Sequence, residues 1–279
     1  MAQARGDRLQ RWFVGGPPSA FLIVFFLVPA LIMVIASFRY PGEFGGLAPL
    51  LSAAPAEEAG LTTENYRVFF SDRIYFDIFL KSFGVAALTT VVCLAIAYPL
   101  ALLIARSPKR HRDLMVLLCV LPFASNFLVR VYAWMIILGL FDLLFTNFAV
   151  LAAMVYVHLP FMILPLYTNL EKHDPVLLDA AQDLGANGWA RFWRVTFPLS
   201  LPGVFAGAAL VFIPVLGMFA IPEILGGIGD WLVGNMIKES FLGVRDWPFG
   251  SMLSLMLTLC VLAIAAAAAW LARGSVARA

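Results

Sequence analysis

The sequence predicts an all-α, polytopic membrane protein with six transmembrane helices. Apolar residues make up 62% of the 279 residues and charged residues only 13%, and the mean hydropathy is +0.90. A soluble domain carries about 25% charged residues, so one protein core cannot hide this apolar excess. The apolar residues also gather into six runs, each close to the roughly 20 residues that a helix needs to cross a bilayer.

The six spans form a single domain that covers residues 1–279. The first apolar run follows Arg5, Arg8 and Arg11, but it is too long for a signal peptide and lacks a small-residue cleavage site, so we expect it to be retained. We expect the spans, in chain order, at residues 18–38, 82–105, 114–140, 148–168, 203–226 and 250–272.

Lysine and arginine residues are distributed unevenly between the two sets of loops. One set, which includes both termini and the loop at 169–202, carries twelve of them, whereas the loops at 39–81 and 226–250 carry six. Basic residues concentrate in cytoplasmic loops. We therefore expect cytoplasmic termini, a cytoplasmic loop at 169–202, and an outer loop at 39–81 whose second half forms short helices.

Several kinds of chemistry lack their motifs in this chain. No lysine follows a glycine, so there is no phosphate-cradling loop for a nucleotide. The three histidines form no HExxH pair, and there is no GxSxG elbow for a nucleophile. The three cysteines lie in apolar runs without metal-ligand spacing, and a net charge of +2 is too small to indicate nucleic acid. We expect no catalytic residues, no metal and no nucleic-acid partner, and a protein that transports or anchors something.

The predicted cytoplasmic loop has the pattern of a folded unit. Asp174 before Pro175 is a helix start, apolar residues then recur at helical spacing, and Gly185 can end the helix with a positive φ. Asn187 can cap a second helix, which Pro198 and Pro202 would end before the fifth span. This pattern leaves two interpretations open. Either a partner protein covers the apolar ridge, or the helices lie on lipid headgroups with Trp189 and Trp193 as anchors.

The same loop resembles the EAA loop of ATP-binding-cassette (ABC) importer permeases of the MetI-like fold. The pattern of that loop is E-A-A, three residues, G, nine residues, I-x-L-P. Here Asp179, Ala180 and Ala181 match the triplet, and Gly185 matches the glycine. The closing I-x-L-P is matched by Val195, Phe197 and Pro198. The departures are Asp179 for Glu, Val195 for Ile and Phe197 for Leu.

The resemblance implies a set of partners and a place in the cell. In this family the loop forms a coupling helix that docks on an ATPase subunit. The resemblance thus implies two ATPase subunits that carry ATP and magnesium, so that this chain needs no cofactor of its own. It also implies a second permease, expected to be a different chain, a periplasmic binding protein, and a lipid-embedded, multi-pass place in the bacterial inner membrane.

Two further stretches resemble the permeases of spermidine/putrescine importers. They are LPFASNFLVRVYAWMIILG at 121–139 and AIPEILGG at 220–227, followed by GNMIKESFLGVRDWPFGS at 234–251. The resemblance implies a polyamine or a similar small cation as cargo, with an amino-acid-like compound or iron as the alternative. An ATP-independent secondary transporter is the other class, which inverted repeats or an intramembrane proton relay would favour.

Charged and aromatic residues within the spans are the candidates for a substrate path. Pro122, Asn126, Arg130 and Trp134 recur every four residues, which would place them on one face of the third span. An intramembrane arginine is costly, so Arg130 either lines the path or braces a carboxylate or free carbonyls. In the fifth span, Glu223 could attract ammonium groups.

Two aromatic residues could assist that carboxylate, and Glu223 has a second interpretation. Tyr132 or Trp134 could add cation–π attraction for an ammonium group. Alternatively, Glu223 pairs with Arg130 and contacts no substrate. Asp230, in the segment after Glu223, is expected to serve the fold and binding-protein docking rather than ligand contact.

Overall fold

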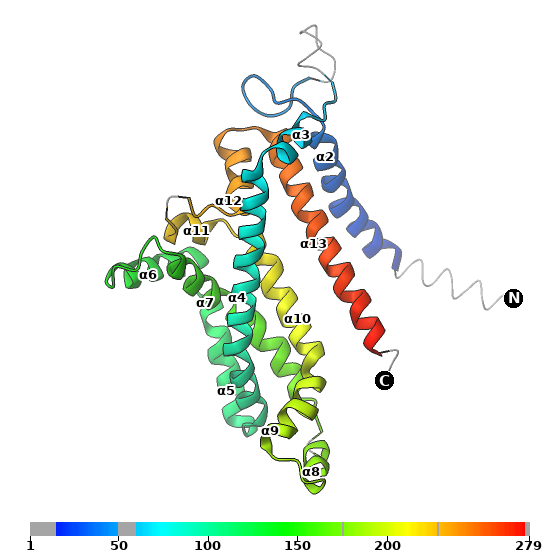
Figure 1. Ribbon diagram of the computed structural model, residues 1–279, viewed down its shortest axis with the longest axis vertical. Coiled ribbons are helices and arrows are strands. Elements are labelled where there is room, and N and C mark those ends of the chain that lie inside the picture. Colours follow the sequence, from blue (N-terminus) through cyan, green and yellow to red (C-terminus); the bar gives the residue numbers. More distant parts are fainter. Residues whose placement is uncertain (1–14, 50–59, 175, 228, 277–279) are drawn as a thin grey trace, which may run out of the picture. The chain divides into compact units, whose positions relative to one another are not determined.

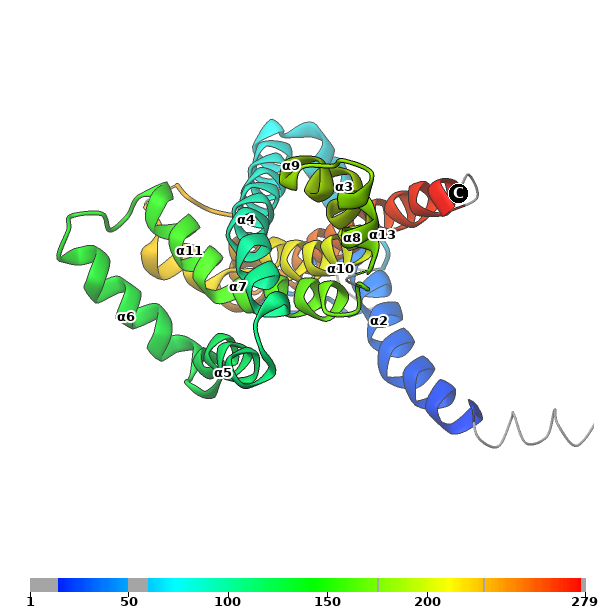
Figure 2. The ribbon, with the colours of Figure 1, turned by 90° about the horizontal axis from the view of Figure 1, so that it is seen from below.

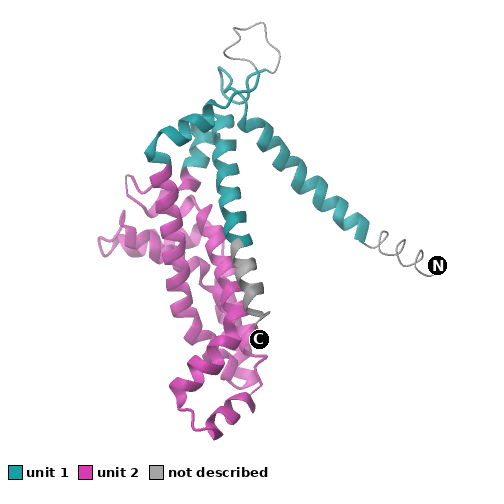
Figure 3. Cartoon of the chain, turned by 45° about the vertical axis from the view of Figure 1, so that its right-hand side comes forward, with its two compact units in different colours: residues 1–75, 236–279 teal, residues 76–235 magenta. Residues whose placement is uncertain are grey.

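The computed structural model describes residues 15–49, 60–174, 176–227 and 229–276 (Figure 1). The elements in these ranges are α-helices with short 3₁₀ and π turns, which confirms the all-α prediction. The chain divides into two compact units, one of Met1–Tyr75 with Met236–Ala279 and one of Phe76–Asn235 (Figure 3).

The first unit joins the two ends of the chain. A helix over Gly15–Ser37, whose last part is α2 (Val28–Ser37), contacts α13 (Trp247–Val276), and α3 (Glu64–Ser71) also contacts α13. The Asn65 side-chain amide donates hydrogen bonds to the carbonyl oxygens of Ser37 and Arg39, at 3.0 and 3.2 Å. These bonds satisfy backbone groups that the end of α2 leaves free.

The second unit is built on α4 (Arg73–Arg106), α7 (Asn147–Leu170) and α10 (Phe197–Leu216). Its other elements include α5 (Lys109–Val120), α6 (Phe127–Gly139), α8 (Val176–Asp183), α9 (Gly188–Arg191) and α11 (Ala220–Leu225). The Cys93 thiol of α4 donates to the Val155 carbonyl of α7 at 3.6 Å, and the Tyr98 and Ser200 hydroxyls join α4 to α10 at 2.7 Å. Figure 2 shows these three helices together, with α5 and α6 extending to one side.

Small residues let α7 and α10 approach closely. A Cβ atom added at Gly203 would lie 2.8 Å from the Asn169 Cβ, and one added at Gly207 would lie 2.7 Å from the Met162 sulfur. Membrane helices that pack through glycines gain close van der Waals contact between backbones. These two glycines therefore hold the beginning of α10 against the end of α7.

The predicted third span is not one continuous helix, so the prediction of a single helix over 114–140 was wrong. The chain forms Lys109–Ala124 and Phe127–Gly139, which meet at 93°. Ser125 and Asn126 adopt extended backbone conformations, with ψ of 150° and 139°, and the Asn126 side chain accepts a hydrogen bond from the Leu128 amide at 2.8 Å. Asn126 therefore starts a new helix instead of continuing the old one.

The fifth predicted span is shifted along the chain. The sequence predicted residues 203–226 after a loop ended by Pro198 and Pro202, whereas the helix runs from Gly188 to Leu216. A π turn, η3 (Phe192–Thr196), precedes Pro198, and the Phe197 amide bonds to the Phe192 carbonyl five residues back. This wider turn rearranges the backbone bonds just before a proline that has no N–H, so the helix continues through it. Glu223 consequently lies on α11, outside the long helix.

Five of the described helices are long and apolar enough to cross a membrane, or six if the bent pair counts as one span. The predicted outer loop at 39–81 is also shorter than expected, because α4 begins at Arg73. The Asp72 carboxylate accepts a hydrogen bond from the Ile74 amide at 3.0 Å and so starts the helix there.

Candidate functional site

The segment between α7 and α10, residues 171–196, is folded and is here called the polar loop. Its first helix, α8, begins where the Asp174 carboxylate accepts a hydrogen bond from the Val176 amide at 3.0 Å. Its second helix, α9, begins where the Asn187 side chain accepts from the Ala190 amide at 2.8 Å. Both predicted helix starts are confirmed, since short polar side chains meet the free amides of each first turn.

Gly185 ends α8 as the sequence predicted. Its φ is +81°, and the Gly185 amide bonds to the Gln182 carbonyl while the Ala186 amide bonds to the Ala181 carbonyl, at 2.8 and 3.0 Å. These two bonds are those of a glycine-terminated helix end. The Arg191 guanidinium then donates to the Gln182 side chain at 2.7 Å, which ties α9 back to α8. The loop is thus a compact pair of short helices.

The structure distributes the residues of the EAA-like pattern over three elements, α8, η3 and α10. Asp179 and Ala180 are exposed on α8, and Ala181 is half-buried beside them. Val195 lies in the π turn η3, which contacts α8, and Pro198 lies in the first turn of α10. The beginning and the end of the pattern are therefore close in space, although Ala180 and Val195 are 15 positions apart in the sequence.

Large apolar side chains on the polar loop remain uncovered. Leu184 is 89% exposed and Trp189 is 72% exposed. Two neighbouring aromatic rings, Phe192 and Phe197, instead pack against Tyr98 of α4, with centroid distances of 5.4 and 5.9 Å. The loop is thus anchored to the helices on one side and presents an apolar surface on the other, and this surface needs a partner or a lipid. Tyr98 was not singled out in the sequence because its contact with the loop depends on the fold.

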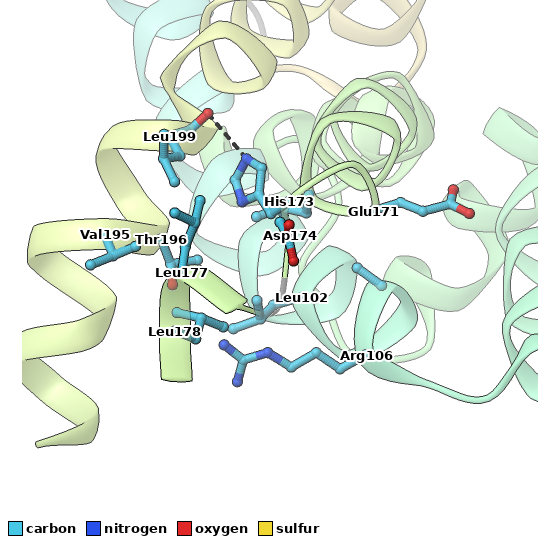
Figure 4. A pocket seen from close by; sticks show the side chains of 12 residues that line it. Leu102, Arg106, Glu171, His173, Asp174, Leu177, Leu178, Val195, Thr196 and Leu199 are labelled. Carbon is cyan, nitrogen blue, oxygen red and sulfur yellow. Dashed lines mark hydrogen bonds between the residues drawn. The ribbon is translucent and has the colours of Figure 1, made fainter. Parts of the chain in front are cut away.

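A pocket of about 470 Å³ lies between the polar loop and the ends of α4 and α10 (Figure 4). Leu177 and Leu178 of α8 form one wall, and Arg106, at the end of α4, reaches toward it. The His173 ring nitrogen Nε2 donates to the Leu199 carbonyl at 3.2 Å and closes one side. An ion pair of 2.8 Å between Arg112 and Glu171 links α5 to the start of the loop.

The path candidates lie on two short helices that contact each other, α6 and α11. Pro122 does not share a helical face with Arg130 and Trp134, because the chain turns after it. Asn126 caps α6, and its carbonyl accepts a hydrogen bond from the Arg130 amide at 3.3 Å. On α6, the Arg130 guanidinium lies over the Phe123 ring, 5.6 Å from its centre, and Trp134 packs edge-to-face on Tyr156 at 5.6 Å.

Glu223, Tyr132 and Asn126 are the exposed members of this set. Glu223 lies on α11 and Tyr132 on α6, each with its side chain accessible. The structure brings the helices of Glu223 and Arg130 together, and the interpretations of Glu223 as a path residue and as a partner of Arg130 both stay predictions.

A polar contact that the sequence did not reveal lies near the N-terminal end of α4. The Lys81 ammonium is 2.8 Å from an Asp230 carboxylate oxygen and donates to the Gly229 carbonyl at 3.2 Å. The hydrogen bond from Lys81 lowers the pKa of the Asp230 carboxyl below its ordinary value, against the opposing effect of burial. The two residues are 149 positions apart, so no local pattern could have indicated their pairing.

Comparison with known proteins connects this architecture to one family. Residues 97–279 match the family described as "Binding-protein-dependent transport system inner membrane component". The chain belongs to this family. The binding-protein-dependent permeases of this family are inner-membrane proteins, which agrees with the several candidate spans found here.

Relatives of this permease are similar over most of their length. The spermidine/putrescine transport system permease protein PotB of Haemophilus influenzae is 40% identical over 258 residues, which cover 86% of each chain. PotB of Escherichia coli is 36% identical, over 86% of this chain and 89% of its own. A solved bacterial ABC transporter involved in the import of the acidic polysaccharide alginate has a TM-score of 0.69 at 14% identity, over 97% of this chain and 98% of its own, which shows that the fold is shared.

Proposed function

We propose that this permease imports polyamines, of the spermidine and putrescine class, and that its polar loop receives the work of ATP hydrolysis from a partner subunit. The observation that supports polyamines as the cargo is the 40% identity, over 86% of both chains, to a spermidine/putrescine permease. An amino-acid-like compound or iron remains the alternative cargo.

The polar loop supports the docking of an ATPase. Two helices with tightly defined ends expose Leu184 and Trp189, next to the exposed Asp179 and Ala180 that match the EAA pattern. An apolar ridge on a helix pair of fixed geometry can fit a groove on a partner and transmit its movement. Because this chain has no phosphate-cradling loop, ATP and magnesium belong on two copies of that partner.

The distribution of basic residues supports the orientation. Twelve lysines and arginines accompany the termini, the polar loop and the loop at 106–112, so these lie in the cytoplasm, where the ATPases are. The opposite side then faces a periplasmic binding protein that delivers cargo. A second permease, a different chain in this proposal, completes the path across the membrane.

The transport cycle in this proposal is the one that the resemblance to ABC importer permeases implies. ATP binding closes the two ATPases and displaces the polar loops, and the helices rock from an inward-open to an outward-open state. On the path, Glu223 of α11 offers a carboxylate to an ammonium group, with Tyr132 and Trp134 of α6 nearby in the fold. Each ammonium that leaves water needs such a partner to offset its desolvation.

Reconstitution with partners from the same host tests the cargo. Proteoliposomes holding both permeases and the ATPases, with the binding protein outside and ATP inside, are expected to accumulate labelled putrescine and spermidine. Uptake that persists without ATP would indicate a secondary transporter. Uptake of amino-acid-like compounds or iron, with no polyamine uptake, would contradict the cargo.

A cross-linking experiment tests the docking surface. Leu184→Cys, in a background without the three native cysteines, is expected to cross-link to the ATPase in native membranes. Leu140→Cys is the matched control, because Leu140 is also highly exposed, at 77%, but follows α6. Cross-linking of Leu140→Cys alone, or protection of Leu184→Cys by lipid without any ATPase contact, would support the interfacial interpretation instead.

A further inference from the structure

The segment after α11 forms a small acceptor site around the end of the Lys81 side chain. The ammonium nitrogen contacts the Asp230 carboxylate at 2.8 Å and the Gly229 carbonyl at 3.2 Å. An ammonium group has three donors and no acceptor, so a carboxylate oxygen with an adjacent carbonyl is a suitable pair of partners.

The backbone of the segment itself holds these acceptors in place. The second Asp230 carboxylate oxygen accepts from the Gly227 amide at 3.0 Å, and the Asp230 amide donates to the Gly227 carbonyl at 3.0 Å. Gly229 has a φ of +96°, which only glycine adopts readily, and this conformation sets the direction of its carbonyl. The site is therefore preorganised by a tight turn.

Lys81 is not needed to attach this segment to α4. The next residue of α4, Ser82, is buried, and its hydroxyl oxygen accepts a hydrogen bond from the Val233 amide at 2.8 Å. A buried hydrogen bond with good geometry holds the segment, whereas an ion pair between partly exposed groups adds little. The Lys81 and Asp230 side chains are 37% and 20% exposed. Lys81 can thus leave while the acceptors stay.

The group that fills the site has the chemistry of the proposed cargo. A lysine side chain is four methylene groups ending in a primary ammonium, which is the aminobutyl group that putrescine and spermidine carry. We propose that Asp230 and Gly229 form a binding site for the terminal ammonium of a polyamine, and that Lys81 occupies this site when no cargo is present. The inference rests on the proposed function and adds a site beyond Glu223.

Because the Lys81 ammonium is tethered, a polyamine can enter the site only above a certain local concentration. An attached group competes at an effective concentration of millimolar order, which free polyamine must match locally. A docked binding protein that releases its cargo at this side provides such a local concentration. Between cycles, Lys81 keeps the Asp230 carboxylate paired.

Carbodiimide coupling of the wild-type transporter tests this exchange directly. The reagent activates a carboxylate, and the amine held against it displaces the activating group to form an amide. Without cargo, peptide mass spectrometry is expected to find an amide between Lys81 and Asp230. With saturating putrescine, this cross-link should fall at least about fivefold, and putrescine should instead be joined to Asp230.

Two controls separate exchange from general effects of a diamine. Asp142 is exposed near α6 and should acquire no preferential putrescine adduct. Tetramethylated putrescine keeps both charges but cannot form an amide, so it should reduce the Lys81–Asp230 cross-link without labelling Asp230. An unchanged cross-link at saturating putrescine, in a transporter that does import putrescine, would overturn the inference while leaving the proposed function intact.

Uptake kinetics provide a second measurement. Lys81→Gln removes the tethered competitor and is expected to lower the KM for putrescine, whereas Asp230→Asn should raise it about tenfold, the loss expected for one charge-assisted hydrogen bond. If Lys81 were only a structural contact, both variants would reduce stability together and leave KM unchanged. That result would contradict a binding role for Asp230.

Discussion

Arg130 and Glu223 are the two charges whose positions most affect the proposed path. Their helices, α6 and α11, are in contact, and Arg130 lies over the Phe123 ring. A cation over an aromatic face is partly compensated without a carboxylate. Arg130 therefore does not depend on Glu223 alone for the compensation of its charge.

We predict that Glu223→Gln lowers polyamine uptake by about tenfold or more, because a charged acceptor for the cargo is lost. Uptake by the double variant Glu223→Gln with Arg130→Gln should not recover, because removal of the arginine does not restore the lost acceptor. Uptake is measured at matched expression, with Glu64→Gln on α3 as a control for the substitution itself. Recovery of uptake in the double variant would instead favour the salt-bridge interpretation.

Single residues also show how far the sequence could predict the site. Asp174, Gly185 and Asn187 act through bonds to residues two to five positions away, so local patterns predicted their roles correctly. The pairings of Lys81 with Asp230 and of Tyr98 with Ser200 join residues more than 100 positions apart. Such contacts depend on how the helices pack, and a single sequence carries no local signal for them.

At the scale of the elements, hydropathy identified the helical segments but not their breaks. Both halves of the third predicted span are apolar, so an average over 20 residues does not register the turn at Ser125 and Asn126. The fifth span shows the opposite error. Pro198 suggested a helix end, but the π turn before it accommodates the missing N–H and the helix continues.

The cap of α6 gives a testable consequence of the break. Asn126→Ala should destabilise α6 by about 1 kcal/mol, because the Leu128 amide loses its acceptor. Asn126→Asp should preserve both stability and uptake, since aspartate is an equivalent cap. Thermal unfolding measures the stability of both variants, and uptake assays measure their transport. A changed KM in Asn126→Asp, with unchanged stability, would show that the side chain lies on the path.

The end of α8 gives a second prediction. Gly185→Val should place a β-branched residue at a φ of +81°, with a strain of roughly 1–2 kcal/mol. The turn between α8 and α9 would then shift, and uptake should fall on the order of tenfold while the spans remain inserted. Gly188→Ala is the matched control, since a Cβ there meets no atom within 4 Å and its φ is not positive. Normal uptake by Gly185→Val would count against a coupling role for the loop.

At the scale of the whole molecule, the chain is one subunit of a multi-subunit transporter in the proposed function. It contains candidate spans and a folded polar loop, but the source of energy lies on a different subunit in the proposed function. The family match over residues 97–279 includes the polar loop and the helices on both sides of it.

We predict that the purified chain hydrolyses no ATP, because it has no phosphate-cradling loop. ATPase activity should appear only when the ATPase subunits are added, and it should increase with the cargo-loaded binding protein. The measurement is phosphate release by the subunit alone and by the full complex. Hydrolysis that remains with the subunit through successive purification steps would contradict the assignment.

The close packing at Gly203 and Gly207 has a mechanical consequence. These residues lock the start of α10 to the end of α7, so the two stalks that carry the polar loop keep a constant spacing. A force that a partner applies to the polar loop would therefore not separate α7 from α10. The loop would therefore have to displace both helices together. A larger side chain at either glycine would separate α7 from α10, and part of a movement of the loop would then not reach the far ends of the helices.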